Sequence, residues 1–311
     1  MKYISKIKIL ALFMISIANT SEAQQEPLYN QYLFNHFAIN PAYAGSREAI
    51  SANVLYRDQW VGFNGAPTSQ TFNIHGPFKQ KNFALGLNAY REEVGPTENI
   101  SVMGTYAYHL RLGKGKLSLA LRGGFFNSQF NSDKLNFREN GDRFAGIVPS
   151  SAFAPTFDFG AYYYGKKTFI GFSATHLTEE EIGYEGLPQD KVSGFNLKRH
   201  FMLSGGRVIK LNDTWLLKPS TLVKYVGGAP LNVDLNISAL YNKLIWVGVS
   251  YRSSETVVGM LEFNITDYLR VGYSYGYGLS ELQDFNQGTH ELFVGADFSL
   301  FESESVSPRN F

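Results

Sequence analysis

The 311-residue sequence contains no cysteine, which excludes disulfide frameworks, thiolate zinc sites and cysteine nucleophiles. Charge is scarce as well, because only 18% of the residues are charged, against about 25% in a typical soluble domain. The net charge is +1, so the chain has no basic excess with which to follow a phosphate backbone. No nucleic-acid partner is therefore expected.

Long apolar runs are missing from most of the chain. One short run, Ile9 to Ala18, follows a lysine-rich start and precedes Ser21-Glu22-Ala23, a small-x-small cleavage pattern. The run has about half of the twenty residues that a membrane-spanning helix needs, which disfavours the alternative of an N-terminal membrane anchor. We therefore interpret residues 1–23 as a secretory signal peptide, and we expect no spanning helix after it.

What the sequence does contain is a regular alternation of apolar and polar residues. In residues 231–241 every second side chain is apolar, from Leu231 to Tyr241, and those between them, such as Asp234, are polar. The same period of two recurs in 117–125, 245–252 and 268–277. Successive side chains of a β-strand point to opposite faces, so each segment predicts a strand with one apolar and one polar face.

About fourteen segments carry this pattern, and most have the nine to eleven residues, or slightly more, that a tilted strand needs to cross a bilayer. Strands of soluble β-sandwiches are usually shorter, with about five or six residues. The predicted strands are 48–58, 68–75, 82–93, 98–112, 115–128, 155–165, 168–177, 199–210, 214–226, 231–242, 244–253, 255–265, 267–277 and 288–300.

The connections between these strands support the same architecture. The longer ones, 59–67, 129–154, 178–198 and 278–287, all fall on one side of the predicted sheet. Outer-membrane barrels place long loops outside the cell and short turns in the periplasm. The sequence thus predicts an all-β fold: an antiparallel up-and-down transmembrane β-barrel of about 14 strands. We expect it to span residues 48–301, with a short non-strand segment, 24–47, packed at or in the barrel and a tail, 302–311.

In such a barrel the apolar rows face lipid and the polar rows line the lumen. The lumen then receives charged residues of both signs, and we favour a mutually paired network over a porin-like selectivity ring, because unpaired buried charges are unfavourable. These residues are Arg122, Asp158, Lys218, Lys224, Asp234, Arg252, Glu262, Arg270, Glu291 and Asp297. Tyrosine and tryptophan near strand ends predict the aromatic girdle at the membrane surface: Tyr162, Tyr163, Tyr164, Trp215, Tyr241, Tyr273, Tyr275 and Tyr277.

The sequence patterns that resemble catalytic or metal-binding motifs lack the context that this chemistry needs. The six histidines lack metal-ligand spacing. The one Gly-x-Ser-x-Gly match, Gly272 to Gly276, lies within an alternating strand, whereas a nucleophile elbow needs a turn from strand into helix. The acidic run Glu179 to Glu181 is more typical of a solvated loop than of a calcium site. We expect no enzyme, no metal and no cofactor.

Residues 24–47 differ from the rest, because alternation gives way to amide side chains mixed with aromatics. Two motifs stand here, Tyr29-Asn30-Gln31-Tyr32 with Asn35, and Asn40-Pro41-Ala42-Tyr43-Ala44-Gly45. A third, Tyr56-Arg57-Asp58-Gln59-Trp60, ends the first predicted strand. With these motifs and its final strand, His290 to Phe298, the mature chain resembles the PorP/SprF family of type IX secretion membrane proteins along essentially its whole length.

The resemblance implies a non-enzymatic outer-membrane protein of Bacteroidota that works with the type IX secretion and gliding machinery. It also implies support for the secretion or surface attachment of a large adhesin through that cargo's C-terminal domain. The expected partners are thus this domain, other components of the machinery and the outer-membrane bilayer. The candidate family-motif and partner-contact residues are Tyr29, Gln31, Asn35, Asn40, Pro41, Ala42, Tyr43, Gly45, Arg57, Gln59 and Trp60.

Several alternatives stay open at this point. Arg57, Gln59 and Trp60 either organise a site at the outer rim or serve packing. The loops 129–154, 178–198 and 278–287 are candidate cargo contacts by their length. Instead of a docking barrel, the chain could be a transport barrel for small or hydrophobic solutes, or, less in keeping with its strand lengths, a soluble secreted β-sandwich.

Overall fold

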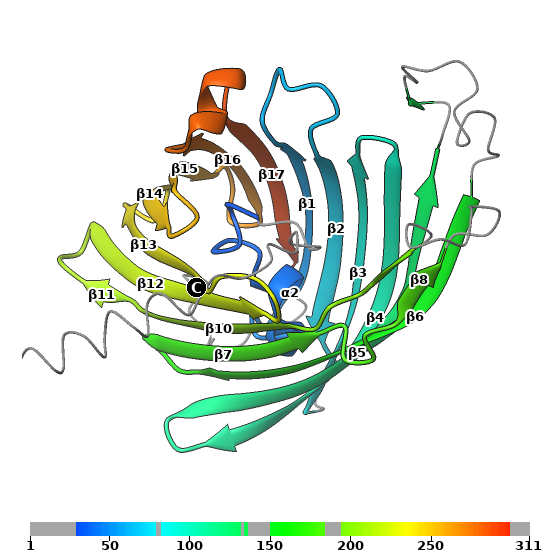
Figure 1. Ribbon diagram of the computed structural model, residues 1–311. Helices are drawn as coiled ribbons and strands as arrows, with labels where there is room; N and C mark the ends of the chain where they lie inside the picture. The colour runs from blue at the N-terminus through cyan, green and yellow to red at the C-terminus, as the bar shows by residue number, and fades with distance from the viewer. Residues whose placement is uncertain (1–28, 79–81, 132–133, 136–149, 184–193, 299–311) are drawn as a thin grey trace, which may run out of the picture.

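A computed structural model describes residues 29–78, 82–131, 134–135, 150–183 and 194–298. Within them the chain forms an antiparallel β-barrel of 14 strands, which confirms the predicted fold class (Figure 1). The strands are β1 (Ile50–Asp58), β2 (Thr68–Pro77), β3 (Phe83–Val94), β4 (Thr97–Leu112), β5 (Gly115–Phe130), β6 (Ser150–Tyr164), β7 (Thr168–Thr175), β10 (His200–Arg207) continued by β11 (Ile209–Lys210), β12 (Trp215–Val226), β13 (Asn232–Tyr241), β14 (Ile245–Arg252), β15 (Thr256–Asn264), β16 (Leu269–Gly278) and β17 (Thr289–Phe298).

The ring closes because the first and last strands pair. β1 lies antiparallel to β17 from Ile50 opposite Phe298 to Asp58 opposite His290. Every other barrel strand pairs with the strand that follows it around the ring. Hydrocarbon offers no hydrogen-bond partners to a backbone, so only a ring without free edges satisfies strands that cross it.

The two faces of the wall follow the alternation in the sequence. On β13, Leu235 and Ile237 are 57% and 51% exposed on the outside, whereas Asp234 between β13's apolar positions is fully buried inside. All ten predicted lumen charges lie on this inner side, with Asp297 only slightly exposed. No helix of the described residues is both long and apolar enough to cross a membrane.

Two of the predicted girdle residues are placed differently. Tyr162 and Tyr164 point into the barrel and are almost completely buried, so their assignment to the girdle is wrong. Tyr162 packs against Tyr43 and Phe169 inside the lumen. Their phase on β6 matches that of Asp158, which also faces inward. Tyrosine is typical of the membrane surface, but the alternation of side chains along β6 determines that these two tyrosines point into the lumen.

Two connections contain more structure than expected. The predicted loop 178–198 holds a short hairpin of β8 (Glu181–Gly183) and β9 (Gly194–Asn196), separate from the barrel sheet. The connection after β16 holds the 3-10 helix η3 (Glu281–Phe285). These connections lie at the end with the longer loops, which we call the outer end, and the barrel begins and finishes at the opposite, periplasmic end. The predicted signal peptide, 1–23, and tail, 302–311, lie outside the described residues.

Residues 29–47 lie inside the ring, and we call them the plug. In Figure 1 they form the blue segment enclosed by the strands, including the short helix α2 (His36–Ile39). The 3-10 helix η1 (Pro41–Tyr43) follows it. Nearly every plug residue is buried, and the largest apolar clusters of the protein form between the plug and the inner wall.

Candidate functional site: the plug in the barrel lumen

The plug runs through the lumen from the outer half to the periplasmic end. At its start, Asn30 contacts Glu291, which lies opposite Arg57 near the outer end of β1. At its end, Arg47 contacts Asp297, next to the residue with which β17 ends. The chain therefore descends the whole lumen before it turns into β1.

A glutamate of the wall holds the start of the plug. The carboxylate of Glu291 accepts the backbone N–H of Asn30 at 2.7 Å and that of Gln31 at 2.9 Å, one on each oxygen. The Gln31 side chain returns a bond to the Glu291 carbonyl at 3.1 Å. Arg57 pairs with the same carboxylate at 3.1 Å, and both side chains are almost completely buried. The charge of Glu291 is thus neutralised by β1 while its oxygens bind the plug.

An arginine on the opposite wall holds the preceding residue. Arg252 forms two bonds to Asp234, at 3.0 and 3.1 Å, and donates to the Tyr29 carbonyl at 3.2 Å. The Tyr29 hydroxyl lies 2.9 Å from that of Thr71. We call Arg57, Glu291, Asp234 and Arg252 the outer latch, because together they bind consecutive plug residues.

Amide side chains fasten the middle of the plug. Asn35 accepts a bond from Asn73 of β2 at 3.3 Å. Asn40 donates to the carbonyls of Ala161 on β6 and Phe172 on β7, at 3.1 and 3.2 Å. Its side-chain oxygen accepts the N–H of Ala42 at 2.9 Å and so caps η1. A single asparagine therefore both shapes the plug and ties it to two strands.

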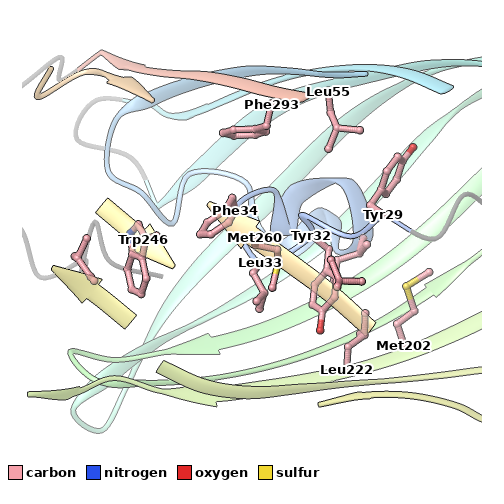
Figure 2. Close-up of a cluster of buried hydrophobic side chains, with 13 residues drawn as sticks. Tyr29, Tyr32, Leu33, Phe34, Leu55, Met202, Leu222, Trp246, Met260 and Phe293 are labelled. Atoms are coloured by element: carbon pink, nitrogen blue, oxygen red, sulfur yellow. The ribbon is translucent and has the colours of Figure 1, made fainter. Parts of the chain in front are cut away.

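Apolar side chains fill the space between these polar contacts (Figure 2). Tyr32, Leu33 and Phe34 of the plug belong to one cluster with wall residues, in which Phe34 lies against Trp246 and Tyr32 points toward Leu222. The Lys218 ammonium lies 4.8 Å from the centre of the Trp246 ring, in the range of a cation–π interaction. Burial of these side chains stabilises the plug by about 25 cal/mol for each Å² of apolar surface removed from water.

His36 occupies the centre of the plug and is fully buried. Its ring stacks on Tyr43 at 5.2 Å and meets Phe169 edge-on at 5.1 Å. Neither ring nitrogen has a hydrogen-bond partner within the described part of the chain. Burial, helped by the nearby cations Lys218 and Arg47, lowers the pKa of His36 to about 3. The histidine is therefore neutral at physiological pH.

The periplasmic end of the plug is fixed by ion pairs. Arg47 binds Asp297 through two nitrogens, at 3.0 and 2.7 Å. Asp297 also lies 3.3 Å from Arg270, which pairs with Glu262 at 3.4 Å. Further pairs join Arg122 to Asp158 and Lys224 to Asp234. Opposite charges thus pair along the wall as predicted, except that Lys218 forms no ion pair within the described residues and lies over the Trp246 ring instead.

Glycines of the wall let the plug approach closely. A Cβ atom at Gly160 would lie 2.4 Å from the Asn40 side-chain oxygen and 2.8 Å from the Ala42 nitrogen. One at Gly272 would lie 2.5 Å from the Gln31 side chain, and one at Gly86 would lie 2.5 Å from Phe37. Side chains at these positions would displace the plug. In the plug itself, Gly45 has φ +72°, a left-handed conformation that suits glycine.

The structure brings most of the candidate motif residues together. Tyr29, Gln31, Asn35, Asn40, Pro41, Ala42, Tyr43 and Gly45 are all part of the plug. Arg57 belongs to the outer latch and donates to Gln59 at 2.7 Å. Trp60 lies apart from them, in the connection after β1, with φ +49° and partial exposure.

Other plug contacts were missed in the sequence. Glu291, Asp234 and Arg252 were assigned to the lumen, but not as ligands of the plug. The inward phase of their strands was the available signal, since it put buried charges within reach of any segment inside the barrel. Nothing in the sequence distinguished Gly160 from glycines elsewhere, because its role depends on a contact with residues 40 and 42.

The wall glycine Gly160 gives a first prediction. Gly160→Ala should displace η1 and destabilise the plugged barrel by about 1–3 kcal/mol, because the added methyl meets backbone that cannot move aside. Gly259→Ala is the matched control, since a Cβ there meets nothing within 4 Å. The guanidinium midpoint of unfolding should fall only for Gly160→Ala. Equal midpoints for the two variants would contradict the role of Gly160.

The outer latch gives a second prediction. Glu291→Gln should destabilise the plug by about 3–5 kcal/mol, because it leaves Arg57 buried without its counter-charge. Protease sensitivity of the plug and ion conductance in planar bilayers should both rise. The control, Glu98→Gln, makes the same chemical change in the partly exposed pair with Arg91 and should alter stability by less than about 1 kcal/mol. If the Glu291→Gln barrel had the same protease resistance and the same ion conductance as the parent, the outer latch would not hold the plug.

The buried histidine gives a third prediction. Its pKa is about 3 in the folded barrel and about 6.5 in an unfolded chain, so the stability contributed by neutral His36 is complete above about pH 6.5 and is lost as the pH falls toward 3. Conductance should therefore rise on acidification from pH 7 to pH 4. His36→Phe keeps an aromatic ring without the titration and should flatten this dependence, while carboxylates such as Glu291 titrate in both proteins. Identical pH profiles would refute the role of His36.

Comparisons with known proteins bear on the whole chain. Among curated proteins, none matches this sequence. Solved structures that are similar include the toluene transporter TbuX of Ralstonia pickettii, with TM-score 0.49, 12% identity and coverage of 84% of this chain and 93% of that one. A FadL homologue of Pseudomonas aeruginosa has TM-score 0.47 and 12% identity, with coverage of 89% of this chain and 95% of that one. The translocator domain of autotransporter NalP from Neisseria meningitidis has TM-score 0.44 and 13% identity, with coverage of 80% of this chain and 87% of that one.

A family match covers residues 21–296 and carries the description "Type IX secretion system membrane protein PorP/SprF". The match includes the plug, all but the last residues of the barrel and the motifs on which the resemblance rests. The closed 14-strand barrel with its apolar outer face fits a protein of the outer membrane. This chain belongs to the PorP/SprF family of type IX secretion system membrane proteins and is an outer-membrane component of that system.

Proposed function

We propose that the chain is a plugged docking barrel, which supports the secretion or cell-surface attachment of a large adhesin-like cargo by binding the cargo's C-terminal domain. The proposal gives the barrel a binding role and no catalytic one. The observation that carries it is the plug, because the buried Glu291 carboxylate binds its backbone at the outer end and the buried Arg47–Asp297 ion pair holds it at the periplasmic end. A large partner therefore meets the outer surface of the barrel and not a path through it.

Three outer connections support docking, because they are joined into one surface that we call the outer rim. Val61 and residues 287–288 exchange backbone bonds, with Val61 N–H to the Gly288 carbonyl at 2.9 Å and Gln287 N–H to the Val61 carbonyl at 2.8 Å. Gly95 N–H reaches the Gly65 carbonyl at 3.0 Å. The rim thus comprises 59–67, 95–96 and 279–288.

The outer rim contains solvent-exposed apolar side chains. Phe285 of η3 is 69% exposed and Phe63 is 45% exposed. Their connections lie at the outer end, beyond the paired parts of the strands. Of the three loops expected to contact cargo, 278–287 belongs to this rim, whereas parts of 129–154 and 178–198 lie outside the described residues. Exposed aromatic residues on ordered loops suit a protein partner.

The test combines a deletion with rim variants. Deleting the gene should abolish surface display of an adhesin that depends on it. Phe63→Ala with Phe285→Ala should reduce display about tenfold or more while the barrel keeps its heat-modifiable mobility, since a few anchoring residues contribute about 2 kcal/mol or more each to a typical interface. The control is Phe78→Ala, which removes an exposed phenylalanine at the periplasmic end. Normal display of every adhesin in the deletion strain would refute the proposal.

A further inference from the structure

One junction of the barrel wall is only half paired. β5 pairs with β6 along all of Ser150–Tyr164, but β7 pairs with β6 only from Phe159 to Tyr164. One more bond follows, from Leu177 N–H to the Phe157 carbonyl at 2.8 Å. Beyond Phe157, the described residues provide β6 with no strand on its β7 side. In Figure 1, β6 continues past the end of β7.

The backbone groups left on this side can be identified. In an antiparallel strand, alternate residues direct both their N–H and their C=O to the same neighbour. Because the Phe157 carbonyl points toward the β7 side, the groups of Pro155, Phe153 and Ser151 do so as well. Pro155 has no N–H to offer, and a proline within a sheet is typical of such an edge. The edge therefore presents the N–H groups of 151 and 153 and the carbonyls of 151, 153 and 155.

Side-chain exposure changes at the same point. The outward-facing Phe159 and Ala161, beside β7, are half-buried, whereas Ser151, Phe153 and Phe157 are exposed. Phe153 is 66% exposed, the second highest value among the large apolar side chains of the described residues. The outer row of this edge is thus open and apolar.

The inner side of the edge is, by contrast, covered and held in place. Ala152 and Ala154 are buried in a cluster with Phe126 of β5, Ile182 of β8 and Leu197. The β8–β9 hairpin lies against the inner face of β6 but shares no ladder with it. The edge is therefore a pre-formed strand whose inner face is packed, whose outer face is exposed and whose backbone is unpaired on the β7 side.

We propose that β6 from Ser151 to Phe157 is a docking edge, onto which an extended segment of the cargo's C-terminal domain adds as a strand. The proposal rests on the docking function proposed above and names the part of the barrel that receives the partner. Main-chain groups at strand spacing are recognised by another strand, whereas lipid has no donors and acceptors at that spacing. The occupant is thus a polypeptide with apolar side chains at alternate positions, which continue the outward row of Phe153 and Phe157.

The first test removes a main-chain donor. Phe153→Pro deletes the N–H that points toward the β7 side and leaves the bonds to β5 in place, whereas Phe153→Ala deletes only the side chain. The variants are expressed in a strain that lacks the gene for this protein and therefore does not display an adhesin that depends on it. Compared with the parent protein, Phe153→Pro should lower display of that adhesin about tenfold or more, and Phe153→Ala should keep it within about twofold. Heat-modifiable mobility reports barrel folding. Full display by a folded Phe153→Pro protein overturns the docking edge but leaves the docking function standing. Normal display in the deletion strain defeats the docking function itself.

The second test needs no destabilising change and uses the absence of cysteine. Ser151→Cys in the full-length barrel is combined with single cysteines scanned along the C-terminal domain of the same adhesin. Disulfides should form at one position of one segment, the residue that lies directly opposite Ser151 in the added strand, and not at the positions beside it. The control, Ser253→Cys, is exposed at the outer end between the fully paired β14 and β15 and should form none. Absence of disulfides at Ser151, or equal trapping by both cysteines, overturns the proposal.

Discussion

The structure depends on one constraint, that no backbone donor or acceptor can remain unpaired in hydrocarbon. The pairing of β1 with β17 meets it by closing the sheet into a ring. Closure fixes the inner face as well, because the alternation that turns Leu235 toward lipid turns Asp234 inward. A ring with an apolar outside therefore encloses polar and charged side chains, which need partners of their own.

The plug provides part of these partners, so the wall and the plug stabilise each other. Glu291 is paired with Arg57, but each of its two carboxylate oxygens also accepts a hydrogen bond from the plug, one from the N–H of Asn30 and one from that of Gln31. Arg252 likewise joins Asp234 to the carbonyl of Tyr29. Breaking a buried ion pair is unfavourable because it leaves one charge buried without a partner. A network in which every group is hydrogen-bonded instead favours a single conformation of its side chains. The paired lumen is thus also what keeps the plug in position.

Periodicity predicted the barrel well, since a row such as that of β13 depends only on neighbours in sequence. It failed where a contact partner is distant. Gln31 and Glu291 are 260 residues apart, and no local pattern indicates that they meet. Tyr162 was assigned to the girdle by its residue type, although its phase on β6 turns it toward the plug. The predicted start of β6 at residue 155 was too late, since the strand begins at Ser150. A proline usually marks the end of a strand, but here the N–H that Pro155 lacks would point to the side on which β6 is unpaired, so the strand continues through it.

The unpaired part of β6 is compatible with the rule that closes the ring. A tilted strand crosses the membrane with about 9–11 residues, and counting these from Tyr164 at the periplasmic end reaches only to the region of Ala154 and Pro155. The N–H groups of 151 and 153 therefore lie at or beyond the outer surface of the hydrocarbon, where water can satisfy them until a strand replaces it. A strand added there exchanges water for main-chain partners without opening the part of the ring that faces lipid. The extra length of β6, 15 residues against 8 in β7, thus places a free edge where the membrane tolerates one.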